Sequence, residues 1–209
     1  MEEERIGTLE RVDLFYLPFF EYKNVLDEEQ CSKLIEFCKE HDYVDTVAGN
    51  DSYAQYSADT NVIEKVPEMK GFFEKLVSDV SYQIMRQAST DFIINNSWCT
   101  KTEKGQSTVA HVHKNFYMSG VLYLQEGCAI EFKNPMFEKN PFLIEVEEVT
   151  PFTCGSSVHY PEKGSFILFP AWLEHGIPEW KGDETRYSIA MNIHPKGLYG
   201  LATSKMYVK

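Results

Sequence analysis

The stretch HVHKNFYMSGVLYLQ, residues 111–125, joins two histidines to a run of residues that favour β-structure. Since alternate residues of a β-strand point to the same face, His111 and His113 are expected to stand side by side. Two neighbouring imidazoles can bind a metal ion, or they can be polar residues on a solvated strand face. Because the whole chain has only six histidines, the surrounding sequence must decide between these interpretations.

From residue 90 onward, short β-type runs alternate with turns. This rhythm is typical of a β-sandwich or a β-barrel. The runs are DFIINNSWCTKT (91–102), STVAHVH (107–113), MSGVLYL (118–124), AIEFKN (129–134), LIEVEEV (143–149), SFILFP (165–170) and YSIAMNI (187–193).

Two helices are predicted ahead of this β region. The first follows Asp27, an N-cap residue with two glutamates directly after it and apolar residues at helical spacing. The second covers residues 67–88, begins with proline and carries one broad apolar face. We therefore expect a mainly β protein whose N-terminal helical decoration, about 27–88, packs on a double-sheet core, about 90–195, in a single domain spanning 1–209.

Charge and cysteine content narrow the classes of partner. The net charge of -12 argues against binding to nucleic acid or an anionic membrane, although one buried arginine could still hold a small anion. Five scattered cysteines do not form a disulfide pattern and indicate the reduced thiols of a cytoplasmic protein. The sequence shows no apolar run of membrane-spanning length, and its acidic start is unlike a signal peptide.

A third histidine, His175, follows the apolar run SFILFP and a turn that contains proline. A pair on one strand with a distant third residue can occupy one face of a metal and leave the opposite face open. Structural zinc is the weaker interpretation, because such sites want four ligands and usually cysteines, and the chain has no Cys-x-x-Cys.

The run RYSIAMNI places Arg186, Ser188, Ala190 and Asn192 on one face. One interpretation of this face is the solvated side of a half-buried strand, but an alanine between polar residues suits a lined cavity better. Arg186 could then hold a carboxylate through two parallel hydrogen bonds, with help from the Ser188 hydroxyl. Tyr123 is either a core aromatic residue or a phenol that donates to the same carboxylate.

The order of these segments resembles that of the iron(II)- and 2-oxoglutarate-dependent dioxygenases. The sequence is most similar to a poorly characterised branch of 2OG-Fe(II) oxygenases with H-x-H, SGVLYL-like and LFP…H…R-x-S segments, over roughly residues 92–194. The resemblance implies a double-stranded β-helix, which is a jelly-roll, cupin-like core.

By this resemblance, His111 and His175 take the places of the first and the distal metal ligand. His113 stands where most of the superfamily has Asp or Glu. Four residues correspond to cosubstrate binding: Arg186 with Ser188 at the far carboxylate of 2-oxoglutarate, Tyr123 at the same carboxylate, and Asn192 toward the metal-side carboxylate.

The function implied is an oxygenase with Fe(II) on three histidines, which uses 2-oxoglutarate, releases succinate and CO2, and hydroxylates its substrate. Two alternatives stay open: a three-His cupin-type dioxygenase that does not use 2-oxoglutarate, and a non-catalytic metal- or sugar-binding jelly roll. The loops 42–66 and 134–163 carry no recognisable recognition motif, so the sequence does not identify the substrate, which is a small molecule or a peptide. The sequence does not define the oligomeric state either. His159 is expected in a loop over the cavity mouth.

Overall fold

The computed structural model describes residues 17–84, 91–139, 145–150 and 153–208, and all structural statements concern these residues. The strands are β1 Phe20–Tyr22, β2 Tyr43–Asp45, β3 Gln55–Ser57, β4 Phe92–Thr102, β5 Thr108–His111, β6 Met118–Tyr123, β7 Ile130–Lys133, β8 Ser156–His159, β9 Phe166–Pro170, β10 His175–Ile177, β11 Arg186–Pro195, β12 Gly197–Tyr199 and β13 Met206–Val208. The helices are α1 Glu28–Lys39, α2 Pro67–Gln83 and the short 3-10 helices η1 Val62–Lys65, η2 Phe137–Lys139 and η3 Ala202–Ser204.

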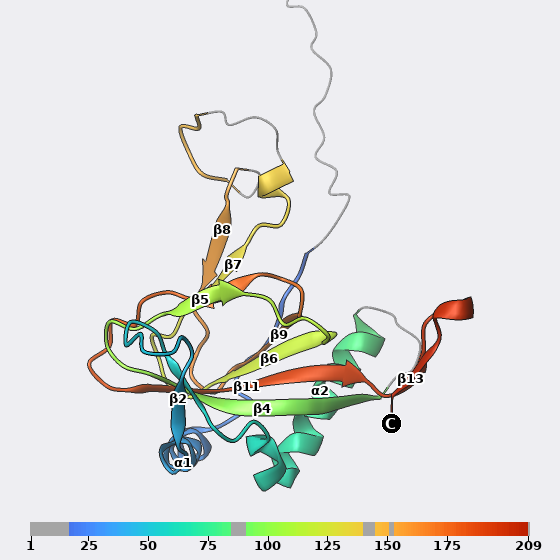
Figure 1. Cartoon of the computed structure of the whole chain (residues 1–209), viewed down its shortest axis with the longest axis horizontal. Helices are drawn as coiled ribbons and strands as arrows, with labels where there is room; N and C mark the ends of the chain where they lie inside the picture. Colours follow the sequence, from blue (N-terminus) through green and yellow to red (C-terminus); the bar gives the residue numbers. More distant parts are fainter. Residues whose placement is uncertain (1–16, 85–90, 140–144, 151–152, 209) are drawn as a thin grey trace, which may run out of the picture.

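Two antiparallel sheets form the core of the fold (Figure 1). The larger sheet has the strand order β1-β9-β6-β11-β4-β3-β2, and the smaller one has the order β5-β10-β7-β8. Strands far apart in the sequence are neighbours in both sheets, as when β11 lies between β4 and β6. This mainly β, double-sheet arrangement with N-terminal helices confirms the predicted fold class.

The helices cover the outer face of the larger sheet (Figure 1). The start of α1 is fixed at the predicted N-cap residue by a capping box, since the Asp27 side chain accepts from the Gln30 N–H at 2.8 Å and the Gln30 side chain accepts from the Asp27 N–H at 2.9 Å. Cys31, Leu34 and Cys38 of this helix are buried in the cluster that α1, α2 and the sheet share. None of the helices in the described chain is long and apolar enough to cross a membrane.

A second hydrophobic cluster lies on the inner side of the sheets. It is built by side chains of the larger sheet and the smaller sheet together with the segments that join them. Its buried members are Tyr123, Cys128, Ile130, Phe132, Ile167, Phe169 and Leu173. The two clusters stabilise opposite faces of the larger sheet, and the inner one borders the cavity described below.

The structure corrects the sequence prediction in three segments. The expected strand 143–149 is absent from its described part, residues 145–149, where the glutamates are exposed. Instead β8 supplies the edge strand: it pairs with β7 and contains His159, which therefore lies in a strand and not in a loop. The region 42–66 is also not wholly irregular, because β2 and β3 extend the larger sheet beside β4.

Candidate functional site

Two of the predicted histidines face each other across neighbouring strands of the smaller sheet. His175, the first residue of β10, pairs with His111, the last residue of β5, and their ring centroids are 4.5 Å apart. The close approach depends on Gly176, since a Cβ there would lie 2.8 Å from the Thr108 carbonyl oxygen of β5. Glycine at this position therefore lets β10 bring His175 to His111.

His113 joins the pair from outside the strand. Because β5 ends at His111, the alternation of a continuous strand does not place His113, which corrects that part of the prediction. Its position is fixed by its backbone N–H, which donates to the Ala171 carbonyl at 2.9 Å. The His113 ring lies 4.8 Å from the His111 ring and 5.2 Å from the His175 ring, centroid to centroid.

The ring orientations of two histidines suit metal binding. Nδ1 of His111 donates to the Val109 carbonyl at 2.8 Å, and Nδ1 of His175 donates to the Leu173 carbonyl at the same distance. This tautomer leaves Nε2 with its lone pair free, which is the usual arrangement of a metal-ligating histidine. One ligand atom from each of the three histidines lies within 4.8 Å of the others, so one ion can be reached from all three.

Burial keeps the imidazoles of His113 and His175 neutral. It lowers the pKa of His175, which is 4% exposed, to about 3 despite the hydrogen bond to Leu173. Burial and the neighbouring His111 likewise lower the pKa of His113 to about 4. Metal binding requires the unprotonated ring, so both residues are in the correct state at neutral pH.

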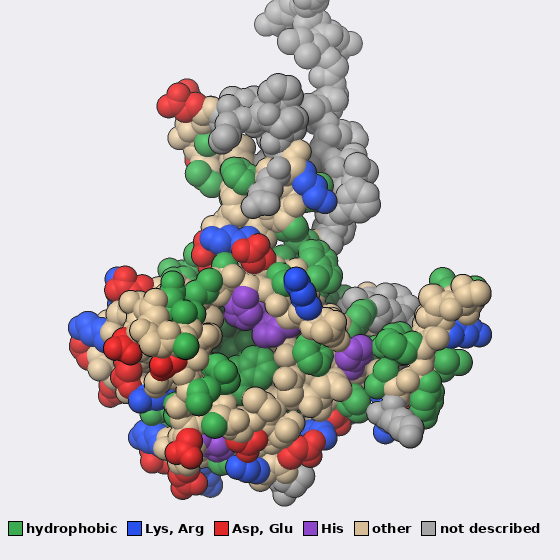
Figure 2. Space-filling view, viewed as in Figure 1, with side chains coloured by type: hydrophobic (Ala, Val, Ile, Leu, Met, Phe, Trp, Pro, Cys, Tyr) green, Lys and Arg blue, Asp and Glu red, His purple; other side chains and the backbone are tan. Residues whose placement is uncertain are grey.

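The histidines stand at the edge of a cavity of about 550 Å³ between the two sheets. Figure 2 shows histidine side chains at a hollow surrounded mainly by hydrophobic and uncharged side chains, with acidic and basic groups around it. Among the described lining residues there is no Asp, Glu or Lys, and Arg186 is the one arginine. The cavity therefore differs sharply from a chain whose net charge is -12.

Arg186 begins β11, is 1% exposed and has no acidic partner in the described chain. Its Nε donates to Cys128 Sγ at 3.2 Å and its Nη1 to Thr102 Oγ1 at 3.4 Å, both neutral groups. Nη2 is buried without a partner. A buried guanidinium without a counter-charge is costly, so this site fits an anionic ligand.

Tyr123 lies next to this arginine, with its ring centroid 5.6 Å from Arg186 Cζ. The side chain is fully buried, behind the residues that line the cavity, and its hydroxyl has no hydrogen-bond partner in the described chain. Burial raises the pKa of Tyr123, so its phenol stays protonated and able to donate. Two unpaired donors, Arg186 Nη2 and Tyr123 Oη, thus occupy the same end of the site.

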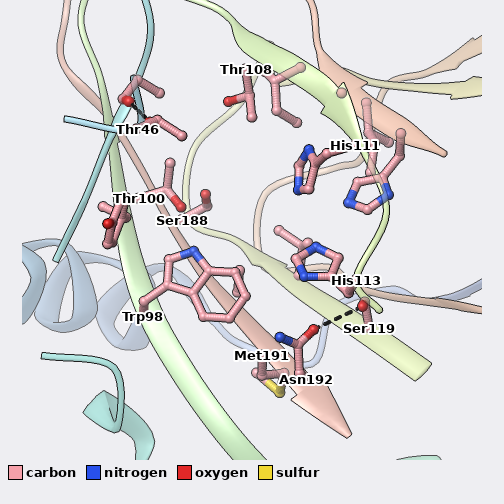
Figure 3. A pocket seen from close by; sticks show the side chains of 18 of the residues that line it. Thr46, Trp98, Thr100, Thr108, His111, His113, Ser119, Ser188, Met191 and Asn192 are labelled. Carbon is pink, nitrogen blue, oxygen red and sulfur yellow. Dashed lines mark hydrogen bonds between the residues drawn. The ribbon is translucent and has the colours of Figure 1, made fainter. Parts of the chain in front are cut away.

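Ser188 and Asn192 follow Arg186 on the same face of β11, and both line the cavity. They are 2% and 3% exposed, so of the two interpretations of this strand face the lined cavity is the one that the structure shows. Asn192 Oδ1 accepts from Ser119 Oγ at 3.0 Å, which directs the amide nitrogen away from that serine (Figure 3). In Figure 3, Asn192 lies on the side of His113, whereas Ser188 lies farther along the strand.

The neighbouring strand β4 supplies lining residues that the sequence argument missed. Asn96, Trp98 and Thr100 pair with Asn192, Ala190 and Ser188 of β11 and line the same cavity. Alternation within DFIINNSWCTKT was the signal that could have found them, because it places these three side chains on one face.

Comparison with known proteins gives one family. Residues 96–192 match the family model described as "Putative 2OG-Fe(II) oxygenase". The match contains all seven residues predicted for metal and cosubstrate binding, which are His111, His113, Tyr123, His175, Arg186, Ser188 and Asn192. This stretch is therefore similar to the 2OG-Fe(II) oxygenase family. This family uses Fe(II) and 2-oxoglutarate, in agreement with the resemblance seen in the sequence.

Solved structures share the fold of this chain at low sequence identity. HygX from Streptomyces hygroscopicus, crystallised with nickel, 2-oxoglutarate and hygromycin B, is 13% identical, with a TM-score of 0.62 over 86% of this chain and 83% of HygX. The carbocyclase SnoK from nogalamycin biosynthesis is 11% identical, with a TM-score of 0.63 over 85% and 79%. A prolyl-4-hydroxylase from Pseudomonas putida is 14% identical, with a TM-score of 0.57 over 87% and 94%.

These likenesses confirm the predicted double-stranded β-helix. No curated protein matches the sequence of the oxygenase.

Proposed function

We propose that the three histidines hold Fe(II), that 2-oxoglutarate binds between this ion and Arg186, and that the protein hydroxylates a substrate with release of succinate and CO2. The observation that carries the proposal is that one cavity holds three clustered histidines and one buried arginine that has no acidic partner among the described residues. A ligand with a carboxylate at one end and metal-chelating oxygens at the other satisfies both.

Each end of the cosubstrate finds suitable donors on this chain. Arg186 Nη2 and the Tyr123 hydroxyl are the unpaired donors for the far carboxylate, and the Ser188 hydroxyl lies on the same wall. The Asn192 amide lies toward the histidines and suits the metal-side carboxylate. Bound together, Fe(II) and 2-oxoglutarate supply the oxidation of a C–H bond by O2, while the protein orients the reactants and excludes water.

Among the described residues the histidine cluster contains no carboxylate, and this sets the charge of the centre. Three neutral imidazoles leave Fe(II) at a formal charge of +2, and dianionic 2-oxoglutarate brings the sum to zero. A site with two histidines and one carboxylate would instead end at −1. At short range and low effective dielectric one unit of charge is worth several kcal/mol before screening, so the three-His site favours the dianion.

We also propose a cytoplasmic location and a small-molecule or peptide substrate. The location is supported by the five cysteines, which form no disulfide among the described residues and are mostly buried thiols. The net charge of -12 speaks against nucleic-acid or anionic-membrane partners.

Anaerobic titration of the Fe(II) protein with 2-oxoglutarate tests the cosubstrate assignment. Chelation of the ion by the 2-oxo acid should produce a visible charge-transfer band that saturates at one equivalent per iron. A stoichiometric Fe(II) protein that binds no 2-oxoglutarate would favour the three-His dioxygenase that oxidises its substrate directly. Succinate formation under O2 gives an independent readout.

A further inference from the structure

Part of the cavity is lined by residues that are assigned neither to Fe(II) nor to 2-oxoglutarate. Its wall is formed by the segment 46–60, by β4 and by the start of β5. We call this the loop-side wall, and its members are Thr46, Val47, Ala54, Gln55, Tyr56, Thr60, Asn96, Trp98, Thr100, Thr108 and Val109. Nothing in the assigned metal and cosubstrate chemistry uses these side chains.

The loop-side wall carries no formal charge. Arg186 is occupied by the cosubstrate in the proposed function, and the centre of Fe(II), three imidazoles and 2-oxoglutarate is formally neutral. An ammonium or carboxylate group of a substrate would therefore lose its water here without meeting an opposite charge. That loss is expensive, so the wall selects against charged groups.

Trp98 gives the wall a flat apolar face. It is half-buried and belongs to neither hydrophobic cluster of the described residues, so its indole is not a core side chain. Its ring centroid lies 5.7 Å from that of His113, and Figure 3 shows it projecting from β4 into the cavity. Aromatic rings pair at such separations, so a second ring placed on Trp98 would lie beside the histidine cluster.

Two polar atoms of the same wall are buried without a partner. They are Oδ1 of Asn96 and Oγ1 of Thr108, and no other side chain or backbone group in the described chain hydrogen-bonds to them. Buried polar groups are normally paired, and an unpaired one indicates a missing partner. An amide and a hydroxyl are complementary to neutral hydroxyl or amide groups of a ligand.

We propose that the loop-side wall binds an uncharged small molecule with a flat ring and at least one hydroxyl or amide group, stacked on Trp98. The cavity volume of about 550 Å³ lies within the range of small-molecule sites, about 300–1,000 Å³. This inference names the substrate class of the proposed oxygenase and rests on that function only for the statement that the bound molecule is oxidised.

The binding test uses three probes with the same ring system: 2-naphthylmethanol, 2-naphthylmethylamine and 2-naphthoate. Ligand-observed NMR on the Zn(II) protein with saturating 2-oxoglutarate keeps Arg186 occupied and prevents turnover. The alcohol should bind more tightly than the amine or the carboxylate by about tenfold or more. Equal affinity of a charged probe, or no binding of the alcohol, would overturn the proposal.

Two pairs of variants locate the binding site. Trp98→Leu should lower the affinity for the alcohol by about fivefold or more. Trp172→Leu is the control and should leave this affinity unchanged, because Trp172 is 57% exposed and is not among the described lining residues. Val109→Asp places a negative charge on an exposed lining position and should shift the preference toward the amine by about tenfold. Val158→Asp, on exposed β8 outside the lining, is its control.

Retention of the wild-type preference in Val109→Asp would contradict the placement even if Trp98→Leu failed to fold. The alcohol and amine arms, repeated without 2-oxoglutarate, separate this proposal from the proposed function. Selective binding of the alcohol, together with no charge-transfer band in the Fe(II) titration with 2-oxoglutarate, would uphold the neutral site and refute the cosubstrate assignment. A normal charge-transfer band in that titration, together with no preference for the alcohol, would uphold the cosubstrate assignment and refute the neutral site.

Discussion

Arg186 is a buried charge with only neutral partners, and a bound anion is the group that would complete its environment. Arg186→Ala should weaken 2-oxoglutarate by the loss of a charge-assisted contact, on the order of 2–5 kcal/mol, with little change in metal affinity. Arg186→Lys should recover little, because a point charge cannot reproduce the planar fork of guanidinium. Calorimetric titration of the metal-loaded variants measures both affinities.

The control for these variants is Lys104→Ala, which removes an exposed cation that pairs with Asp183, neither of them among the lining residues. Its 2-oxoglutarate affinity should equal that of the unmodified protein. An Arg186→Ala protein with the same affinity as this control would remove the main reason for assigning 2-oxoglutarate to the cavity.

His113 is the residue in which this site departs from the usual carboxylate. His113→Ala should lose most of the bound iron, because two imidazoles remain. His113→Asp should keep iron but bind 2-oxoglutarate more weakly, since the added negative charge opposes the dianion. Elemental analysis of the purified variants gives the iron content. Full iron affinity in His113→Ala, accompanied by sensitivity to chloride, would mean that only two histidines are ligands.

The sequence predicted the residues of this centre better than it predicted their geometry. His111, His113 and His175 do come together, but His113 is held by a hydrogen bond to Ala171 that strand alternation does not contain. Such a long-range contact depends on where β9 ends, which the local pattern near His113 does not encode. Trp98 was missed for a similar reason: it reads as a core aromatic residue until the cavity beside it is known.

At the scale of elements, the approach of β10 to β5 controls the histidine cluster. Gly176→Ala would place a methyl group 2.8 Å from the Thr108 carbonyl oxygen, so β10 must move away from β5. Since His175 precedes this residue and pairs with His111, metal affinity should fall by about tenfold, the size of effect seen when the support of a ligand is removed.

Gly71→Ala is the matched control, because a Cβ at this exposed helical position meets no atom within 4 Å. It should leave metal affinity unchanged and raise the free energy of unfolding by up to about 1 kcal/mol, the difference in helix propensity between the two residues. Unaltered metal binding in Gly176→Ala would show that the histidines do not depend on this strand contact.

Elements that are specified by neighbouring residues in the sequence were predicted well. Short strands that form only by pairing with distant segments were not. The capping box of α1 lies within four consecutive residues and is visible in the sequence. By contrast, β2, β3 and β10 have three residues each, and their strand conformation comes from pairing with distant segments such as β4 and β7. The run 143–149 has alternation without an observed partner for its described residues, and β8 takes the edge position instead.

At the scale of the molecule, the site and the main core are separate. The larger hydrophobic cluster lies between the helices and the outer face of the larger sheet, whereas the histidines and Arg186 lie on its inner side. Substitutions in the site should therefore leave most of the apolar packing intact. This separation allows binding to be measured as added stability of the whole fold.

A ligand that binds only the folded state stabilises it in proportion to the logarithm of its concentration, about 2.7 kcal/mol at a hundredfold excess over Kd. For a chain of this size, that corresponds to a rise in Tm of roughly 5–10 °C. Mn(II) alone should raise Tm, and 2-oxoglutarate should add a second increment only when the metal is present, because the ion supplies half of its contacts. Glutarate, which lacks the 2-oxo group, should add much less.

The decisive comparison is Arg186→Ala, which should keep the Mn(II) increment and lose that of 2-oxoglutarate, whereas His175→Ala should lose both. An equal 2-oxoglutarate increment with and without metal would mean that the dianion binds Arg186 without reaching the histidines. The arginine and the histidine cluster would then be two independent sites that happen to share one cavity, and the ion would have no part in holding the cosubstrate.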